Sequence, residues 1–139
     1  METIKVEGLK ETKRFAKRFA KSLVGGETIL LVGDLGAGKT TFTQFLAKEL
    51  GVKEAVTSPT FNIVKEYDGK KMKLYHFDMY RIEDASELQE IGAEDILYGN
   101  EHDVVIVEWP YNVDVGYKNP IKINIEKISE NAREFKVER

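Results

Sequence analysis

The stretch ETILLVGDLGAGKT, residues 27–40, decides the fold. Its first part, Glu27–Val32, is a compact apolar run that predicts a β-strand buried on both faces. The next part, Gly33–Thr40, matches the pattern G-x-x-x-x-G-K-[ST] of P-loop proteins. A helix is expected to follow from about Thr40 to Leu50, where Gly51 is a stop signal. A buried strand, a glycine-rich turn and a helix in succession predict a phosphate-binding site.

Each position of the turn has a chemical reason. Gly33, Gly36 and Gly38 permit backbone angles that other residues avoid, so that successive N–H groups can face one anion. The start of the helix adds further N–H donors and the positive end of the helix dipole. Lys39 is expected to reach the β- and γ-phosphates of a nucleotide, and the Thr40 hydroxyl is expected to bind Mg²⁺.

Strands and helices alternate along the rest of the chain. Strands are expected at Thr3–Glu7, Asn62–Tyr67, Lys73–Tyr80, Val104–Val107, Ile121–Ile128 and Arg133–Val137. Helices are expected at Leu9–Leu23 and, in one or two pieces, from Asp84 to Tyr98. The alternation predicts an α/β fold in which residues 1–139 form a single P-loop domain. Its sheet should be mixed and mostly parallel, with antiparallel hairpins at the edges and flanking helices.

Composition narrows the class of protein. The 139 residues carry a net charge of −3, with 42% hydrophobic and 32% charged residues, which is typical of a globular chain. No apolar run approaches the ~18 residues that cross a bilayer, and the charged start METIKVEGLK is unlike a signal peptide. The absence of cysteine excludes a disulfide framework and a thiolate metal site. We expect a cytoplasmic protein without membrane attachment, monomeric when alone.

A carboxylate is expected at the end of a strand beside the turn, because P-loop proteins hold their metal from that side. The run VVIV leads into Glu108, followed by Trp109 and Pro110. Most P-loop proteins have aspartate at this position, so Glu108 brings a longer side chain. Glu108 is therefore the expected metal carboxylate, bound directly or through water.

The stretch LYHFDMYR, Leu74–Arg81, is unusually polar for a strand. Period-two alternation places His76, Asp78 and Tyr80 on one face. If this strand lies beside the turn, Asp78 helps to hold Mg²⁺ or orients the attacking water, supported by His76 and Tyr80. Alternatively, the three side chains form a satisfied hydrogen-bond network without chemistry. Arg81 is expected to bind phosphate or to anchor the strand.

Four segments in this order, GDLGAGKTTF, TSPTF, YHFDMYR and VEWP, resemble the TsaE (YjeE) family. Members of that family are bacterial P-loop proteins that act in making the threonylcarbamoyladenosine modification of tRNA. The match is specific from about Gly33 to Pro110 and looser at both ends. The resemblance implies an ATPase that binds ATP and Mg²⁺. It also implies the partners TsaD and TsaB, which carry the threonylcarbamoyl transfer, and an indirect contact with tRNA through that complex.

The resemblance also implies roles for individual residues. Lys39, Asp78 and Glu108 would be catalytic, with Asp78 tied to hydrolysis. Thr40, Glu108 and Asp78 would hold the metal. The segment Ser58–Phe61 resembles a switch that senses the γ-phosphate. The residues expected to contact the nucleotide are Gly33, Gly36, Ala37, Gly38, Lys39, Thr40, Thr41, Thr60, Trp109 and, by a weaker alignment of the final hairpin, Arg133.

Other functions remain open to different degrees. A small GTPase is disfavoured, since no D-x-x-G follows the strand at Val104–Val107 and the chain has no N-K-x-D. A small-molecule kinase usually needs an arginine-bearing lid. The chain has five arginines, and their positions indicate no such lid. The sequence does not distinguish an ATPase from a nucleotide-switched binding module with negligible turnover. The basic stripe of the first helix (Lys10, Lys13, Arg14, Lys17, Arg18 and Lys21) is expected to be a solvated face, with contact to tRNA or an acidic partner as the alternative.

Overall fold

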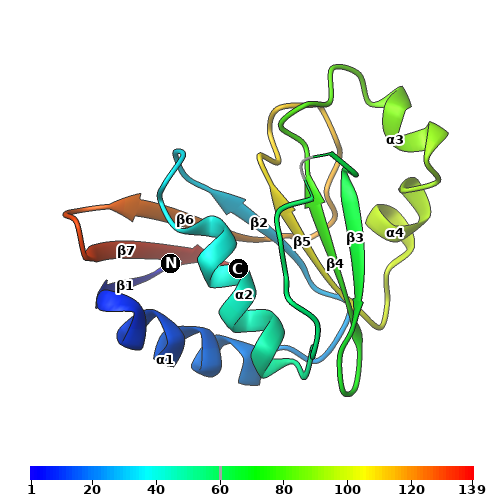
Figure 1. Cartoon of the computed structure of the whole chain (residues 1–139). Coiled ribbons are helices and arrows are strands. Elements are labelled where there is room, and N and C mark those ends of the chain that lie inside the picture. The colour runs from blue at the N-terminus through cyan, green and yellow to red at the C-terminus, as the bar shows by residue number, and fades with distance from the viewer. Residues whose placement is uncertain (60) are drawn as a thin grey trace.

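Four parallel strands form the centre of one seven-stranded sheet in the computed structural model, which describes residues 1–59 and 61–139 (Figure 1). The strands are β1 (Glu2–Glu7), β2 (Thr28–Val32), β3 (Val64–Asp68), β4 (Lys73–Asp78), β5 (Val104–Glu108), β6 (Ile121–Lys127) and β7 (Ala132–Glu138). The helices are α1 (Gly8–Lys21), α2 (Lys39–Glu49), α3 (Ser86–Glu90) and α4 (Glu94–Gly99).

The order of the strands is β1-β7-β6-β2-β5-β4-β3. The central strands β6, β2, β5 and β4 are parallel, while β3 at one edge and β7 and β1 at the other pair antiparallel. The predicted fold class is therefore confirmed, including the antiparallel edges. Because the carboxyl ends of parallel strands meet at one edge of a sheet, the turn after β2 lies beside the ends of β4 and β5.

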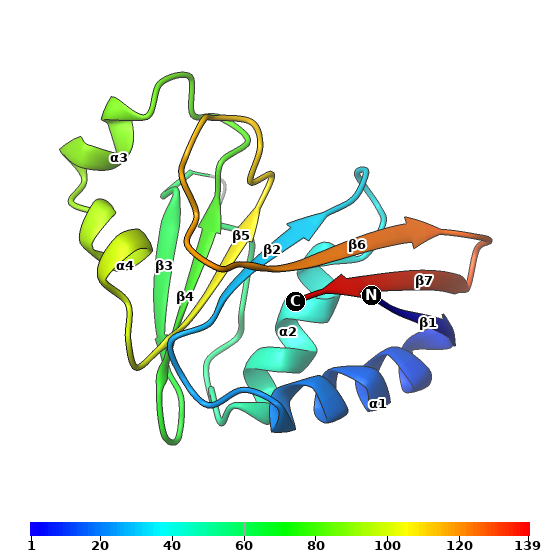
Figure 2. The ribbon, with the colours of Figure 1, turned by 180° about the vertical axis from the view of Figure 1, so that it is seen from behind.

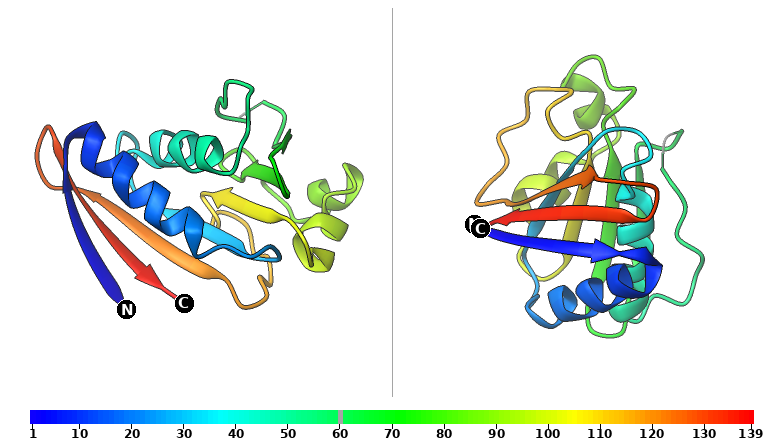
Figure 3. Two further views of the ribbon diagram at one scale, coloured as in Figure 1. Left: turned by 90° about the horizontal axis from the view of Figure 1, so that it is seen from below. Right: turned by 90° about the vertical axis from the view of Figure 1, so that its left-hand side faces the viewer.

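Helices α1 and α2 cover one face of the sheet (Figure 3). The helix α1 turns Thr12, Phe15, Ala16 and Phe19 inward, whereas its six basic residues are exposed, as expected of a solvated face. Phe15 packs against Phe42 of α2, with ring centroids 5.6 Å apart, and against Phe135 of β7, at 4.9 Å. These aromatic contacts fix α1, α2 and the last hairpin to one another.

The other face is covered unevenly. Helices α3 and α4 place Leu88 and Leu97 over β4 and β5, whereas Figure 2 shows β6 and β7 without a helix on that side. In the part of the chain that the structure describes, no helix has the length and apolar character needed to cross a membrane.

Several predicted boundaries move by one or two residues. The helix α2 begins at Lys39 rather than Thr40. The strand β4 ends at Asp78 and not at Tyr80. The prediction that Tyr80 lies on the polar face of this strand is therefore wrong. The Met79 N–H still bonds to the Glu108 carbonyl at 3.0 Å, and the main chain then turns, with the Ile82 N–H donating to the Met79 carbonyl at 3.2 Å. The predicted capping pair is present in part: Glu87 accepts the Asp84 N–H at 3.3 Å, but the Asp84 carboxylate accepts from the Ser86 N–H and not from Glu87.

Position 33, directly after β2, requires glycine because there is no room for a side chain, and not because of an unusual backbone angle. Gly33 is absent from the glycines with positive φ, which include Gly36 and Gly38, so the predicted reason is wrong for this position. A Cβ atom at Gly33 would lie 2.6 Å from the Ile125 carbonyl oxygen and 3.1 Å from the Ala37 Cβ. The turn therefore passes against the backbone of β6, and only glycine fits.

We expect Gly33→Ala to lower the free energy of unfolding by about 1–3 kcal/mol, because the backbone of β6 must shift to admit the methyl group. Gly116→Ala is the matched control, since a Cβ there meets nothing within 4 Å. Denaturant unfolding of both variants measures the difference. Equal stability of the two variants would contradict this packing.

Candidate functional site

The turn after β2 forms an open cradle of backbone N–H groups. Gly36 and Gly38 adopt φ values of +81° and +106°, which glycine adopts without strain. Gly38 is the N-cap of α2, and no side chain caps this helix start within residues 1–59 and 61–139. The first N–H groups of the eleven-residue helix are thus available to an anion.

A pocket of about 440 Å³ lies in front of this cradle. It brings together most of the predicted site: Gly36, Gly38, Lys39, Thr40, Thr41, Asp78, Glu108, Trp109 and Arg133. Gly33 and Ala37 line the adjoining pocket, and Thr60 lies outside the described residues. Leu35, Ser58 and Tyr80 complete the lining, and the sequence pattern had no signal for Leu35 in this role.

Lys39 is held at the rim of the pocket with only 6% of its surface exposed. Its Nζ donates to the Gly33 carbonyl at 2.5 Å and lies 3.6 Å from the centroid of the Trp109 ring. Burial lowers the pKa of Lys39, and the nearby carboxylates, with Glu108 first, act in the opposite direction. The ammonium group has lost water, and among the described residues it has no ion pair, which favours binding of an anion beside it.

Trp109 adopts a left-handed backbone angle, φ +54°, directly after Glu108. A large residue rarely takes this conformation, and such strain concentrates at functional sites. The strained turn directs the ring toward the pocket, where it contacts Lys39 and also Tyr80, with ring centroids 5.1 Å apart.

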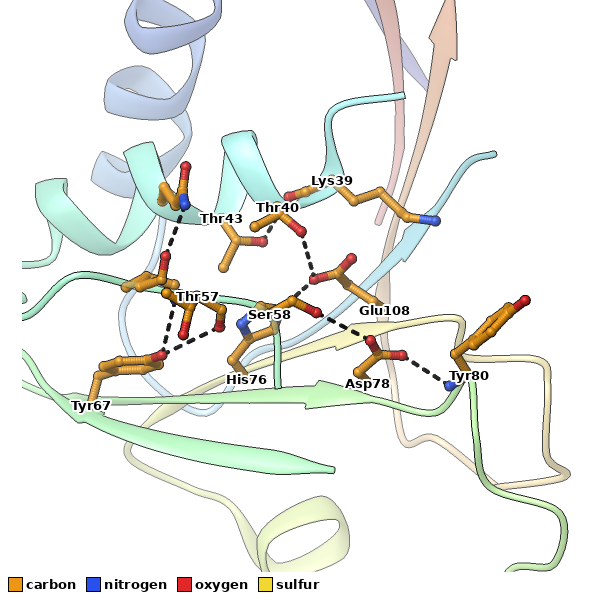
Figure 4. A network of polar contacts seen from close by, with 12 residues as sticks. Lys39, Thr40, Thr43, Thr57, Ser58, Tyr67, His76, Asp78, Tyr80 and Glu108 are labelled. Atoms are coloured by element: carbon orange, nitrogen blue, oxygen red, sulfur yellow. Dashed lines mark hydrogen bonds and ion pairs between the residues drawn. The ribbon is translucent and has the colours of Figure 1, made fainter. Parts of the chain in front are cut away.

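Glu108 lies between the turn and β4 (Figure 4). The Thr40 hydroxyl donates to its Oε2 at 3.5 Å, and His76 Nε2 lies 2.5 Å from the same oxygen. The prediction that His76 supports Asp78 is wrong, because its ring contacts Glu108. Among the described residues His76 Nδ1 has no hydrogen-bond partner, and such a buried unsatisfied group costs about 1–3 kcal/mol.

Asp78 is held by backbone and hydroxyl groups. The Tyr80 N–H donates to its Oδ1 at 2.9 Å, and the Ser58 hydroxyl lies 3.4 Å from its Oδ2 (Figure 4). Tyr80 thus supports Asp78 through its backbone. The Arg81 guanidinium stacks on the Phe61 ring, 4.6 Å from its centroid, so in this structure Arg81 contacts the segment that resembles a switch.

Arg133 connects the turn to the last hairpin. Its Nε donates to the Ala37 carbonyl at 3.0 Å, and its Nη1 donates to the carbonyls of Ser129 and Ala132. A second cavity, of about 110 Å³, lies on the far side of this side chain. It is lined by Gly8, Leu9, Thr12, Ala37, Gly38, Thr41, Glu130, Asn131, Arg133 and Phe135. Sequence reasoning missed its α1 residues, because no motif marks them.

The oxygen atoms of the pocket suit a hard cation. The Thr40 hydroxyl and the carboxylates of Glu108 and Asp78 are ligands that Mg²⁺ prefers. No group of three or more His, Cys, Asp or Glu side chains able to hold a metal occurs in the described residues. This donor set fits Mg²⁺, which usually takes one or two carboxylates and completes its shell with water and phosphate oxygens.

Comparison with known proteins identifies the family. The family model "Threonylcarbamoyl adenosine biosynthesis protein TsaE" matches residues 6–135. The tRNA threonylcarbamoyladenosine biosynthesis protein TsaE of Rickettsia prowazekii is 40% identical over 126 residues, 89% of this chain and 85% of the relative. The protein of that name from Aquifex aeolicus is 39% identical over 136 residues, 96% of this chain and 93% of the relative.

A solved structure agrees with these relatives. The crystal structure of YdiB from Bacillus subtilis is similar with a TM-score of 0.70 and 31% sequence identity, covering 98% of this chain and 83% of that chain. Sequence and fold thus point the same way over nearly the whole length, and the chain belongs to the family of threonylcarbamoyl adenosine biosynthesis proteins TsaE.

Proposed function

We propose that this protein is a Mg²⁺-dependent ATPase of tRNA threonylcarbamoyladenosine synthesis that acts with TsaD and TsaB. The observation that carries the proposal is the convergence of Lys39, Thr40, Asp78 and Glu108 on one pocket at the start of α2. Family membership indicates the pathway, and the chemistry of the pocket indicates the reaction. The reaction is transfer of the γ-phosphoryl group of ATP to water.

The chain would bind the phosphates mainly through its backbone. The N–H groups between Gly36 and Thr41 surround the β-phosphate, while Lys39 leaves the Gly33 carbonyl to contact the β- and γ-phosphates. Thr40 and Glu108 would hold Mg²⁺, which when bound would neutralise charge that develops on the phosphate oxygens. Asp78 accepts a hydrogen bond from the attacking water and so orients it.

The base of the nucleotide fits the second cavity. That cavity shares Gly38, Thr41 and Arg133 with the phosphate pocket, so one nucleotide can occupy both. Leu9 and Phe135 supply apolar walls, and the Asn131 amide can donate or accept hydrogen bonds. The Thr12 hydroxyl donates to the Gly8 carbonyl at 3.1 Å and can accept a hydrogen bond. The motifs that read guanine in GTPases are absent from the sequence, so adenine is the proposed base.

Lys39→Ala should reduce ATP hydrolysis by at least about 100-fold, because the point charge on the transferred phosphate is lost. Nucleotide affinity should fall by a smaller factor, roughly tenfold, since the backbone cradle remains. Lys48→Ala removes an exposed lysine of the same helix and is the matched control. Phosphate release and binding of a fluorescent nucleotide measure both effects. Hydrolysis at the wild-type rate would refute the assignment of the P-loop.

Glu108 and Asp78 should show separate defects. Glu108→Ala is expected to weaken binding of ATP in the presence of Mg²⁺, because a metal ligand is lost. Asp78→Ala should keep binding and lose turnover by about 100-fold or more, since only the water is affected. Titration of Mg²⁺ against bound nucleotide, followed by a hydrolysis assay, distinguishes them. Identical binding defects in the two variants would show that the roles are not separate.

The segment before β3 supports a dependence of partner binding on the nucleotide. The Thr57 backbone and hydroxyl contact Tyr67 and Lys65, while Ser58 faces Asp78. Ile63, a β-branched residue with φ +68°, accepts the Asp78 N–H at 2.8 Å. Strain at Ile63 and a direct bond to the proposed hydrolytic residue are features of a segment with two arrangements.

Affinity for a preformed TsaD–TsaB complex should therefore differ by tenfold or more between an ATP analogue and ADP. Loss of two or three hydrogen bonds to a charged phosphate, at ~1.5–3 kcal/mol each, suffices for such a change. Ser58→Ala should narrow the difference without abolishing nucleotide binding. Equal affinities with the ATP analogue, with ADP and without nucleotide would reject the switch and leave a plain ATPase. Negligible hydrolysis in every mixture, combined with a large difference, would favour the pure binding module.

A further inference from the structure

His76 is a wholly buried imidazole that the proposed chemistry leaves without a role. It is 0% exposed and lies in β4, two residues before Asp78 and on the same face. Its Nε2 is 2.5 Å from Glu108 Oε2. Since a carboxylate oxygen accepts and does not donate, Nε2 carries the hydrogen of this bond.

The partner of this bond is fixed by the register of the sheet. In the parallel pair of β4 and β5, Asp78 is opposite Glu108 and His76 is opposite Ile106. The two side chains therefore share one face of the sheet, and Figure 4 shows the His76 ring below the Glu108 carboxylate. Within residues 1–59 and 61–139, both hydrogen-bond contacts of the Glu108 carboxylate involve Oε2.

A merely structural role does not account for this histidine. The Nδ1 atom is buried and without a hydrogen-bond partner among the described residues, so the side chain carries a penalty that an apolar residue of similar size avoids. The same site already contains buried Lys39, Asp78 and Glu108. The feature that an apolar residue cannot supply is the Nε2–H bond to Glu108.

We propose that His76 is a positioning residue for the metal carboxylate: its bond to Oε2 fixes the Glu108 carboxylate beside the Thr40 hydroxyl, so that both groups would face Mg²⁺. The inference rests on the proposed function, because it assumes a nucleotide-bound Mg²⁺ at Thr40 and Glu108. Mg²⁺ tolerates little departure from its preferred ligand geometry, so small rotations of a long glutamate side chain would be costly. A rigid ring below the carboxylate removes that freedom before the metal arrives.

Two amide variants test the role of the donor. In glutamine the amide nitrogen stands about where Nε2 stands in histidine, whereas the shorter asparagine amide replaces Nδ1 and falls short of Glu108. His76→Asn should raise the Mg²⁺ concentration for half-maximal binding of a fluorescent, non-hydrolysable ATP analogue by about 10–100-fold. His76→Gln should return it to within a few-fold of wild type. Binding of the analogue in EDTA should be the same in all three proteins.

A second background separates positioning from general damage. In Glu108→Gln protein, which has lost the charged ligand, adding His76→Asn should change the Mg²⁺ dependence by less than twofold, because the two residues act through one contact. A full additional loss in that background would overturn the proposal. So would an equal defect in His76→Asn and His76→Gln, or an unchanged Mg²⁺ dependence in folded His76→Asn.

The wild-type protein offers a test that needs no variant. Long-range ¹H–¹⁵N spectra should show His76 protonated on Nε2, with a hydrogen that exchanges slowly and shifts when Mg²⁺ is added to the nucleotide complex. A freely exchanging Nε2 hydrogen, or protonation on Nδ1 alone, would overturn the inference even if the variants do not fold. If the wild-type protein binds nucleotide equally well with and without Mg²⁺, the outcome is different. That result would overturn the metal part of the proposed function as well as the role of His76.

Discussion

The parallel pairing of β2, β5 and β4 is the arrangement on which the rest of the site depends. Its register places Leu31, near the end of β2, opposite Glu108, and Glu108 opposite Asp78. The glycine-rich turn therefore leaves β2 directly in front of two carboxylates that are distant in sequence. A shift of either strand by one residue would turn its carboxylate to the opposite face of the sheet.

Three charged side chains lie at this edge of the sheet and are largely shielded from solvent. Lys39, Asp78 and Glu108 are each 3–6% exposed, so none of them is fully solvated. The Gly33 carbonyl, the Trp109 ring, the Tyr80 N–H and His76 replace part of the lost water. Such groups are expensive to bury and gain when a ligand of complementary charge arrives. This geometry is consistent with the phosphate and Mg²⁺ of the proposed function.

The last hairpin, formed by β6 and β7, completes the site on the side of β2 opposite β5. Because β6 lies next to β2, residues near the end of the chain contact the turn formed near residue 35. Arg133 joins the Ala37 carbonyl to the carbonyls of the β6–β7 turn, and the Ile125 carbonyl leaves room only for glycine at position 33. The contacts of Phe15 with Phe42 and Phe135 then fix α1 beside the second cavity. Cradle, cavity and hairpin are held as one unit.

The sequence by itself determined the elements that depend on neighbours along the chain. A buried run, a turn with the spacing G-x-x-x-x-G-K-T and a helix are encoded locally, so the cradle, Lys39 and Thr40 were predictable. The position of Glu108 followed from the end of a second buried run. Period-two alternation also predicted that His76 and Asp78 share a face.

Only the tertiary structure decided which groups meet across that face. Alternation indicates the face on which a side chain lies but not which strand lies beside it. The sequence therefore paired His76 with Asp78, whereas in the structure β5 lies beside β4 and the His76 ring contacts Glu108. The role of Gly33 is set by the backbone of β6, and the cavity at Leu9 and Asn131 by the docking of α1 against the last hairpin. These contacts join segments far apart in sequence, and their choice depends on the strand order that buries the whole core, which no local pattern contains.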